Sequence, residues 1–193
     1  SINTTSCKIF LEIEDNNSII AGEKGAIYSN LFKNDGTNLY SNILLNISIN
    51  GGIRINDNIA ALISKNMANG GEDKLILYDC KKNNIIKQIE GYSYTESSNG
   101  LCVIPMDEKI INNKVLLCAC KRYKKEQKNG ILLVNPQFGY YQEMEKLFYE
   151  TDDFEVYCFC PISDNKMKET DYFFVGGFDS LKKKGAIKLF KII

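Results

Sequence analysis

The sequence predicts an all-β fold, a β-propeller segment of about four four-stranded antiparallel blades, of which the last is incomplete. Three observations predict it. Pairs of apolar segments joined by turns recur four times in the same order, and their second members begin at residues 25, 74, 130 and 185. This spacing of 49 to 56 residues is close to the roughly 40 to 50 residues of one propeller blade. Apolar residues also alternate with period two or form short continuous runs, as in strands.

The first repeat covers residues 1–50. Ile9, Leu11 and Ile13 occupy every second position of its first apolar segment, which is the period of a strand that buries one face. The four strands predicted here are 7–14, 18–23, 25–28 and 39–49.

The second repeat covers residues 51–98. Asn50-Gly51-Gly52 favours a turn at its start, because asparagine and glycine tolerate positive φ. The segment Asn58–Ser64 is a near-continuous apolar run, which predicts a strand covered on both faces. The four predicted strands are 52–56, 58–64, 74–79 and 85–94.

The third repeat covers residues 99–150, and the turn-forming segment Ser97–Gly100 marks its start. Its predicted strands are 101–106, 114–120, 130–135 and 140–149. The last of these is ambiguous, because the spacing of its apolar residues also suits a short helix. The repeat favours a strand there.

The fourth repeat covers residues 151–193, with predicted strands 154–162, 172–178 and 185–190 and no fourth strand. Gly176 and Gly177 are expected to permit close packing. A three-stranded blade would leave an unpaired edge beside Phe190. We expect the missing strand to come from Ser1–Thr5, from residues outside this segment or from another chain.

Residues 1–193 are therefore interpreted as one propeller region that belongs to a larger propeller. A chain that begins with Ser is expected to be a fragment or a processed product. The alternative is a β-sandwich or another all-β domain with fortuitous hairpins. The fixed order of the four hairpins favours the propeller.

The third-strand segments resemble those of the WD40-type β-propeller family. Leu75–Cys80 is similar to the end of the family's third strand, with Tyr78-Asp79 where Trp-Asp usually stands, and Phe173–Phe178 followed by Gly185–Phe190 is similar to a blade hairpin. The Trp-Asp and Gly-His dipeptides themselves are absent, since the chain has no Trp and no His. The resemblance implies a ring that is commonly closed by seven or eight blades, and a platform for protein interaction more often than an enzyme.

Composition narrows the function classes. The chain has 24 basic and 24 acidic residues, so no global field draws it to a polyanion, and we expect no nucleic-acid partner. The lack of histidine removes the commonest general base and the commonest metal ligand. This argues against an enzyme but leaves open one based on lysine or carboxylate chemistry. We expect no cofactor, no metal and no catalytic residue.

Seven cysteines are an odd number, and most lie in apolar segments. Cys118 with Cys120 and Cys158 with Cys160 form two Cys-x-Cys pairs, which we expect to be packed thiols rather than a zinc site. With no long apolar span and no signal peptide, we expect a reducing intracellular location, in the cytoplasm or the nucleus.

The candidate binding surface is the propeller face that carries the loops between second and third strands and those between repeats. Basic segments lie in two of these loops, and we expect a local basic arc that binds a protein, including an acidic or phosphorylated one. The carboxylates between Glu150 and Glu155 are expected to balance it. The alternative is a solvated hairpin tip. The predicted partner-binding residues are Lys121, Arg122, Tyr123, Lys124, Lys182 and Lys183.

The function predicted from these observations is a non-catalytic protein–protein interaction scaffold. Two alternatives remain open at this point. One is a propeller-based, hydrolase-like enzyme with a site in the central channel. The other is a phosphoinositide-binding propeller, although Arg54 and Arg122 are isolated rather than paired.

Overall fold

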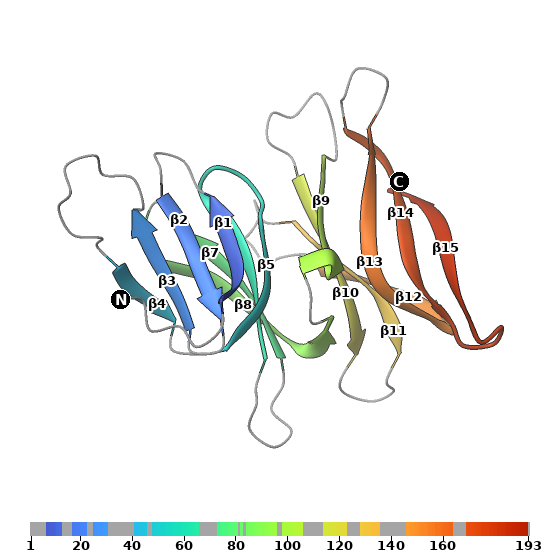
Figure 1. Cartoon of the computed structure of the whole chain (residues 1–193). Helices are drawn as coiled ribbons and strands as arrows, with labels where there is room; N and C mark the ends of the chain where they lie inside the picture. The colour runs from blue at the N-terminus through green and yellow to red at the C-terminus, as the bar shows by residue number, and fades with distance from the viewer. Residues whose placement is uncertain are drawn as a thin grey trace. The chain divides into compact units, whose positions relative to one another are not determined.

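The computed structural model describes residues 7–12, 17–22, 25–30, 41–45, 48–65, 73–80, 82, 84–95, 98–105, 114–122, 128–135, 146–163 and 169–192. Ser1–Glu90 and Gly91–Ile193 form two compact units, called unit 1 and unit 2 below (Figure 1). The boundary lies inside a strand, at Gly91, whose φ of 94° is a backbone conformation that glycine adopts without steric cost.

The described strands form three antiparallel sheets, of four, eight and three strands. Within these sheets the chain runs as four meanders, in which each strand pairs with the next one of the same meander, and the second and third meanders share the eight-stranded sheet. The strands of the first meander are β1 (Cys7–Glu12), β2 (Asn17–Gly22), β3 (Gly25–Asn30) and β4 (Ser41–Leu45). Those of the second are β5 (Ile49–Arg54), β6 (Ile59–Ser64), β7 (Asp73–Asp79) and β8 (Asn84–Tyr94).

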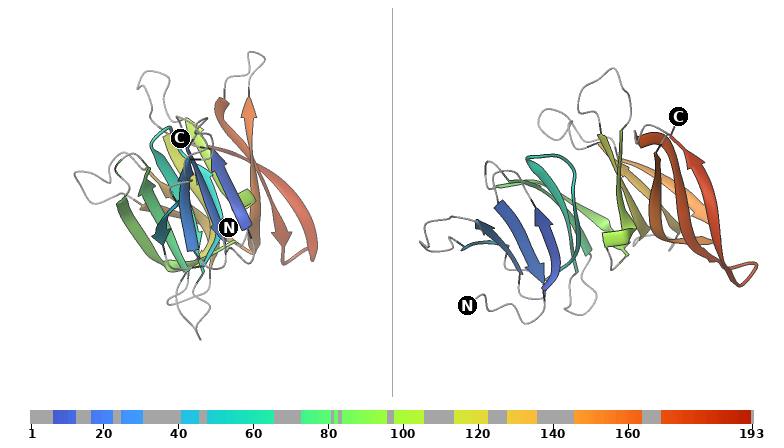
Figure 2. Two further views of the ribbon diagram at one scale, coloured as in Figure 1. Left: turned by 60° about the vertical axis from the view of Figure 1, so that its left-hand side comes forward. Right: turned by 45° about the horizontal axis from the view of Figure 1, so that its top comes forward.

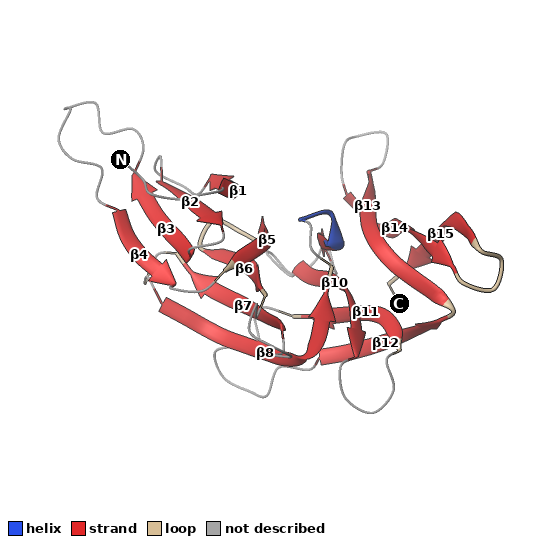
Figure 3. Cartoon of the chain, turned by 60° about the horizontal axis from the view of Figure 1, so that its bottom comes forward, coloured by secondary structure: helices blue, strands red, loops and turns tan. Residues whose placement is uncertain are grey.

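The third meander consists of β9 (Leu101–Pro105), β10 (Lys114–Arg122), β11 (Asn129–Val134) and β12 (Lys146–Asp152). The fourth has three described strands, β13 (Phe154–Ser163), β14 (Glu169–Asp179) and β15 (Lys184–Lys191). Figure 2 shows their strong twist (orange to red). The one helical element in the described part is a 3-10 turn, Ser98–Gly100, which leads into β9 (Figure 3).

The core of unit 1 lies between the sheet β1–β4 and the strands β5–β7. Ile9 and Ile19 from the first sheet pack in one cluster with Leu62, Ile76 and Tyr78 from the second. Along β1 the buried Ile9 alternates with Phe10, which is 55% exposed, as the period-two pattern predicted. The continuous apolar run of β6 is buried at every position, because the strand is covered on both faces.

The core of unit 2 lies between β9–β11 and the sheet β13–β15. Val115, Leu117 and Ala119 from alternate positions of β10 pack with Phe154 of β13 and Val175 of β14. Along one of its edges, β10 pairs with two different strands. Lys114–Cys118 pair with β9, whereas Cys120–Arg122 pair with the end of β8, Tyr92–Tyr94.

The all-β prediction is confirmed, and each described strand overlaps a predicted one. Residues 146–152 are extended, so the described part of the ambiguous segment is strand rather than helix. Residues 140–145 lie outside the described residues, as does Ser1–Thr5, the predicted source of a further strand.

The predicted turn at Asn50-Gly51-Gly52 is wrong, because these residues lie within β5. A Cβ on Gly52 would lie 3.0 Å from Leu62 Cδ2 and 3.1 Å from the carbonyl oxygen of Ala61. Glycine therefore serves here to let β5 approach β6 closely rather than to reverse the chain.

Candidate functional site

Several chain reversals of unit 2 gather at one end of its sheets. The backbone N–H of Ser180, after β14, donates to the carbonyl of Asp153, between β12 and β13, at 2.8 Å. The side-chain amide of Asn129, at the start of β11, donates to the carbonyl of Asp152 at 3.4 Å. We call this region the turn end of unit 2. It comprises the ends of β8, β10, β12 and β14 and the starts of β11, β13 and β15.

The basic residues at the end of β10 are paired with carboxylates. Lys121 forms an ion pair with Glu155 of β13. Arg122 lies 3.8 Å from Glu150 of β12, whose other oxygen lies 3.0 Å from Lys128. Successive residues of a strand point to opposite faces, so Lys121 and Arg122 reach different neighbours. The expectation that nearby carboxylates balance the basic residues is confirmed for Glu150 and Glu155.

The turn between β14 and β15 carries the other predicted residues. Asp179 accepts a hydrogen bond from the backbone N–H of Lys182 at 2.9 Å, and its second oxygen lies 3.5 Å from the Lys182 ammonium. The backbone hydrogen bond, assisted by the Lys182 charge, lowers the pKa of Asp179. Lys183 adopts a left-handed φ of 51°, which closes the turn. Tyr123 and Lys124 lie outside the described residues.

The segment that resembles the WD40 motif uses a related turn. Asp79, at the end of β7, accepts the backbone N–H of Lys82 at 2.8 Å, and Tyr78 beside it is almost fully buried in the core of unit 1. An aspartate that accepts an N–H three residues later stabilises a chain reversal. The Tyr78-Asp79 pair thus has a structural role that needs neither Trp nor His.

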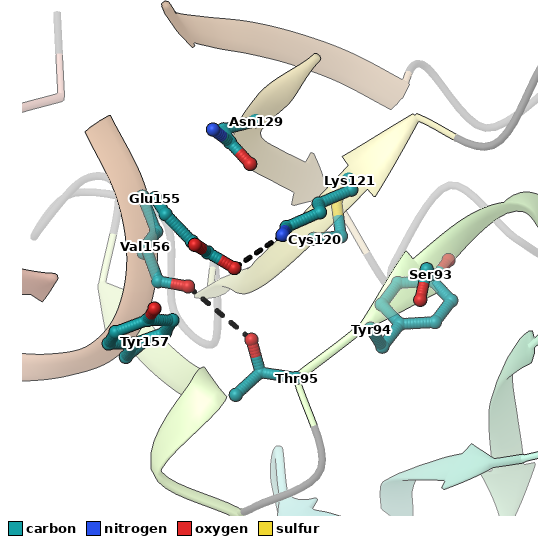
Figure 4. Close-up of a pocket in the computed structure, with 9 residues that line it drawn as sticks. All are labelled: Ser93, Tyr94, Thr95, Cys120, Lys121, Asn129, Glu155, Val156 and Tyr157. Carbon is teal, nitrogen blue, oxygen red and sulfur yellow. Dashed lines mark hydrogen bonds and ion pairs between the residues drawn. The ribbon is translucent and has the colours of Figure 1, made fainter. Parts of the chain in front are cut away.

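A pocket of about 220 Å³ opens at the turn end. Three segments far apart in the sequence line it, as Figure 4 shows: the end of β8, the β10–β11 hairpin and the start of β13. The Thr95 hydroxyl donates to the carbonyl of Val156 at 3.4 Å, and its N–H donates to the carbonyl of Ala119 at 3.1 Å. These bonds join the first segment to the other two. The lining residues are Ser93, Tyr94, Thr95, Cys120, Lys121, Asn129, Glu155, Val156 and Tyr157.

The pocket combines an apolar floor with a charged and aromatic rim. Tyr94, Cys120 and Val156 are buried, whereas Tyr157 is 45% exposed. Hydrogen bonds from Lys121 and Tyr157, together with the Lys121 charge, hold the pKa of Glu155 below its ordinary value despite partial burial. Partial burial and the neighbouring Glu155 carboxylate raise the pKa of Tyr157. At neutral pH the rim therefore presents an ionised carboxylate at Glu155 and a protonated phenol at Tyr157.

The two Cys-x-Cys pairs differ. Cys118 and Cys120 on β10 are 0% and 4% exposed, and burial raises the pKa of both thiols, as expected for packed thiols. For Cys160 that expectation is wrong, because its side chain is exposed. Cys158 is half-buried, and a Cβ on Gly176 would lie 2.6 Å from its sulfur. Among the described residues no three cysteine or acidic side chains lie together as metal ligands would.

Sequence reasoning singled out Lys121, which lines the pocket, but did not predict the pocket. Tyr94 and Thr95 lie at the end of the predicted strand 85–94, which was the signal available, whereas Tyr157 lies within the predicted strand 154–162. Their convergence depends on the pairing of β8 with β10, and the blade pattern did not predict that pairing.

No protein-family model matches the chain, and the search of curated proteins finds no match either. No helix in the described part of the chain is long and apolar enough to cross a membrane.

Proposed function

We propose that this chain is a segment of a WD40-like β-propeller and that it acts as a non-catalytic scaffold for protein–protein interaction. The strands follow one another in the chain as three groups of four and one group of three, and this order supports the blade interpretation. The second and third groups are joined in one eight-stranded sheet by the pairing of β8 with β10. In that interpretation the turn end of unit 2 is the face that carries the hairpin loops and the connections between repeats.

The observation that carries the proposal is the pocket at that face. Pockets for drug-sized ligands usually measure roughly 300–1,000 Å³, and a pocket of about 220 Å³ suits a single anchoring side chain instead. Protein interfaces are organised around such anchors, which are buried in a pocket with polar groups at its rim. Tyr157 adds an exposed aromatic ring beside the Lys121–Glu155 ion pair.

A matched pair of tyrosine variants tests this function. Tyr157 and Tyr172 are 45% and 40% exposed, but only Tyr157 lines the pocket. Immobilised wild-type chain, Tyr157→Ala and Tyr172→Ala are compared by quantitative capture from lysate. We expect Tyr157→Ala to lose the bound partner while Tyr172→Ala retains it, because truncating an anchor residue costs about 2 kcal/mol or more, roughly 30-fold in Kd.

Exchange of ion-pair partners gives a second test at the same face. In the double variant Lys121→Glu/Glu155→Lys the ion pair is retained, but the positive and negative charges exchange positions. We expect this variant to lose the bound partner, because the partner would meet each charge in the wrong place. The double variant Lys191→Asp/Asp171→Lys does the same to a pair of 3.5 Å at the opposite end of β14 and β15 and should leave binding unchanged.

Charge reversal at Arg122, Lys182 and Lys183 then measures how far the binding surface extends beyond the pocket. A set of captured proteins that is identical for wild-type chain, Tyr157→Ala and the Lys121/Glu155 exchange would refute the proposed binding face.

A further inference from the structure

The last meander of unit 2 has three described strands, one fewer than each of the other meanders in the described chain. β3, β7 and β11 each have a fourth strand of their meander on their outer side, namely β4, β8 and β12. β15 pairs with β14 along all eight of its residues, from Lys184 to Lys191, without a register shift. Among the described residues no strand pairs with the other edge of β15.

The register shows which backbone groups face that edge. The N–H of Ile192 donates to the carbonyl of Asp171, within β14, at 3.0 Å. In an antiparallel ladder the residues bond alternately toward one neighbour and toward the other. The N–H and C=O groups of Gly185, Ile187 and Leu189 therefore point away from β14. An edge of this length without proline or bulge is a template for a further strand.

The two faces of β15 differ in chemistry. Ile187 and Leu189 are 75% and 57% exposed, on the side of the sheet where Phe174 of β14 is 42% exposed. By the same alternation, Lys184 and Lys188 project to the opposite face, where Lys188 Nζ lies 4.2 Å from the centre of the Phe154 ring. An added strand would meet Ile187 and Leu189 on one face. On the other face it would meet Lys184 and Lys188, which alternate with the core-packed Ala186 and Phe190.

Charge determines which strand fits. β15 contains three lysines and no acidic residue, and the turn before it adds Lys182 and Lys183. Asp171 and Asp179 pair with Lys191 and Lys182. A second copy of β15 would place like charges against one another, which is unfavourable across strands. A segment that alternates apolar and acidic residues would instead match Ile187 and Leu189 on one face and Lys184 and Lys188 on the other.

We propose that the open edge of β15 binds an extended segment of a partner protein in which apolar and acidic residues alternate, and that this segment adds to the sheet as its fourth strand. Main-chain hydrogen bonds would supply affinity, and the alternating side chains would supply specificity. This site is separate from the pocket and does not depend on the function proposed above.

The test uses the full chain and an end-blocked ten-residue peptide that alternates valine and glutamate. Controls are a peptide alternating valine and lysine and a valine–glutamate peptide N-methylated at every second residue, which cannot complete the ladder. Binding is measured by fluorescence anisotropy, and amide hydrogen exchange is measured along β15. We expect only the unmodified acidic peptide to bind. It should slow exchange at Ile187 and Leu189 at least tenfold and leave Lys188, which bonds inward, unchanged.

Protein variants locate the site. The double variant Ile187→Ser/Leu189→Ser should weaken peptide binding at least tenfold, and Lys184→Glu/Lys188→Glu should do so too. Leu181→Ser is the matched control, because Leu181 is 76% exposed in the turn and outside β15. It should bind the peptide like the wild type. Circular dichroism confirms that each variant is folded.

Three results would overturn the proposal. Equal binding of the N-methylated peptide would show that no strand is added. Slow exchange at Ile187 and Leu189 before any peptide is present would show that the edge is already occupied by the chain itself or by a second copy, and sedimentation would separate these two cases. Failure of the unmodified peptide to bind at millimolar concentration would rule out the acidic segment.

Discussion

The hairpins β6–β7 and β14–β15 occupy the same place in the order of strands, yet their third strands, β7 and β15, differ strongly in burial. Every residue of β6 is buried, and so is every residue of β7 except Lys74. No residue of β15 is buried. β6 and β7 are mainly apolar, whereas three of the eight residues of β15 are lysines. The strands of the two hairpins therefore pair in the same order, whereas the elements that cover their two faces determine how far each strand is buried.

The largest contrast is expected in thiol reactivity. Cys118 and Cys120 lie in the buried strand β10, and Cys160 lies exposed in the final sheet. A buried thiol of raised pKa reacts only when the structure opens. Iodoacetamide labelling followed by peptide mass mapping should modify Cys160 more than about a hundredfold faster than either buried thiol, given unfolding free energies of about 5–15 kcal/mol. In concentrated urea the three rates should converge; equal rates in the native protein would contradict the assigned burial.

Truncation of isoleucine compares the two third strands directly. Ile76 of β7 is 0% exposed and Ile187 of β15 is 75% exposed. Ile76→Ala should lower the free energy of unfolding by about 2–5 kcal/mol, because it leaves a cavity in the core. Ile187→Ala should change it by less than about 0.5 kcal/mol. Urea unfolding followed by circular dichroism measures both, and similar losses would show that the outer face of β15 is covered in solution.

Two glycines of the β14–β15 hairpin are expected to differ in how strongly their substitution by alanine destabilises the protein. A Cβ on Gly177 would lie 2.1 Å from the carbonyl oxygen of Glu155, whereas one on Gly185 would meet nothing closer than 3.9 Å. Gly177→Ala should destabilise unit 2 by about 1–3 kcal/mol, because backbone must move. Gly185→Ala should change the unfolding free energy by less than about 1 kcal/mol. Thermal unfolding of the two variants side by side decides this.

The smallest effect is expected in the decrease of the free energy of unfolding at acidic pH. The pKa of Glu155 is lowered in the folded state, chiefly by its hydrogen bond with Lys121. A carboxylate with a lowered folded pKa stabilises the fold above its unfolded pKa, about 4.3, and this contribution disappears as pH falls through the folded pKa.

Replacing Lys121 tests that linkage. In Lys121→Met the loss of stability between pH 6 and pH 3 should be smaller than in wild type, by less than about 1 kcal/mol, the range of exposed ion pairs. Urea midpoints across this pH range measure the difference. An unchanged decrease at acidic pH would mean that Lys121 does not set the ionisation of Glu155.

The strands were predictable from local pattern, because alternation at Ile9 and the apolar run Ile59–Ile63 report directly on backbone geometry. Burial was less predictable. Cys118 and Cys160 lie in similar sequence surroundings, but only the first is covered. The pocket could not be predicted from the sequence, because Thr95, Lys121 and Glu155 come together only through the pairing of β8 with β10. Composition still indicated that acidic residues would balance basic ones at this end.

The meander order has a kinetic consequence. Nearly every strand of the described chain pairs with the strand that precedes or follows it, and β8 with β10 is the exception. Contacts between near neighbours in sequence close short loops, which costs less chain entropy and speeds assembly. We therefore expect each group of strands to form early in folding, before β8 pairs with β10.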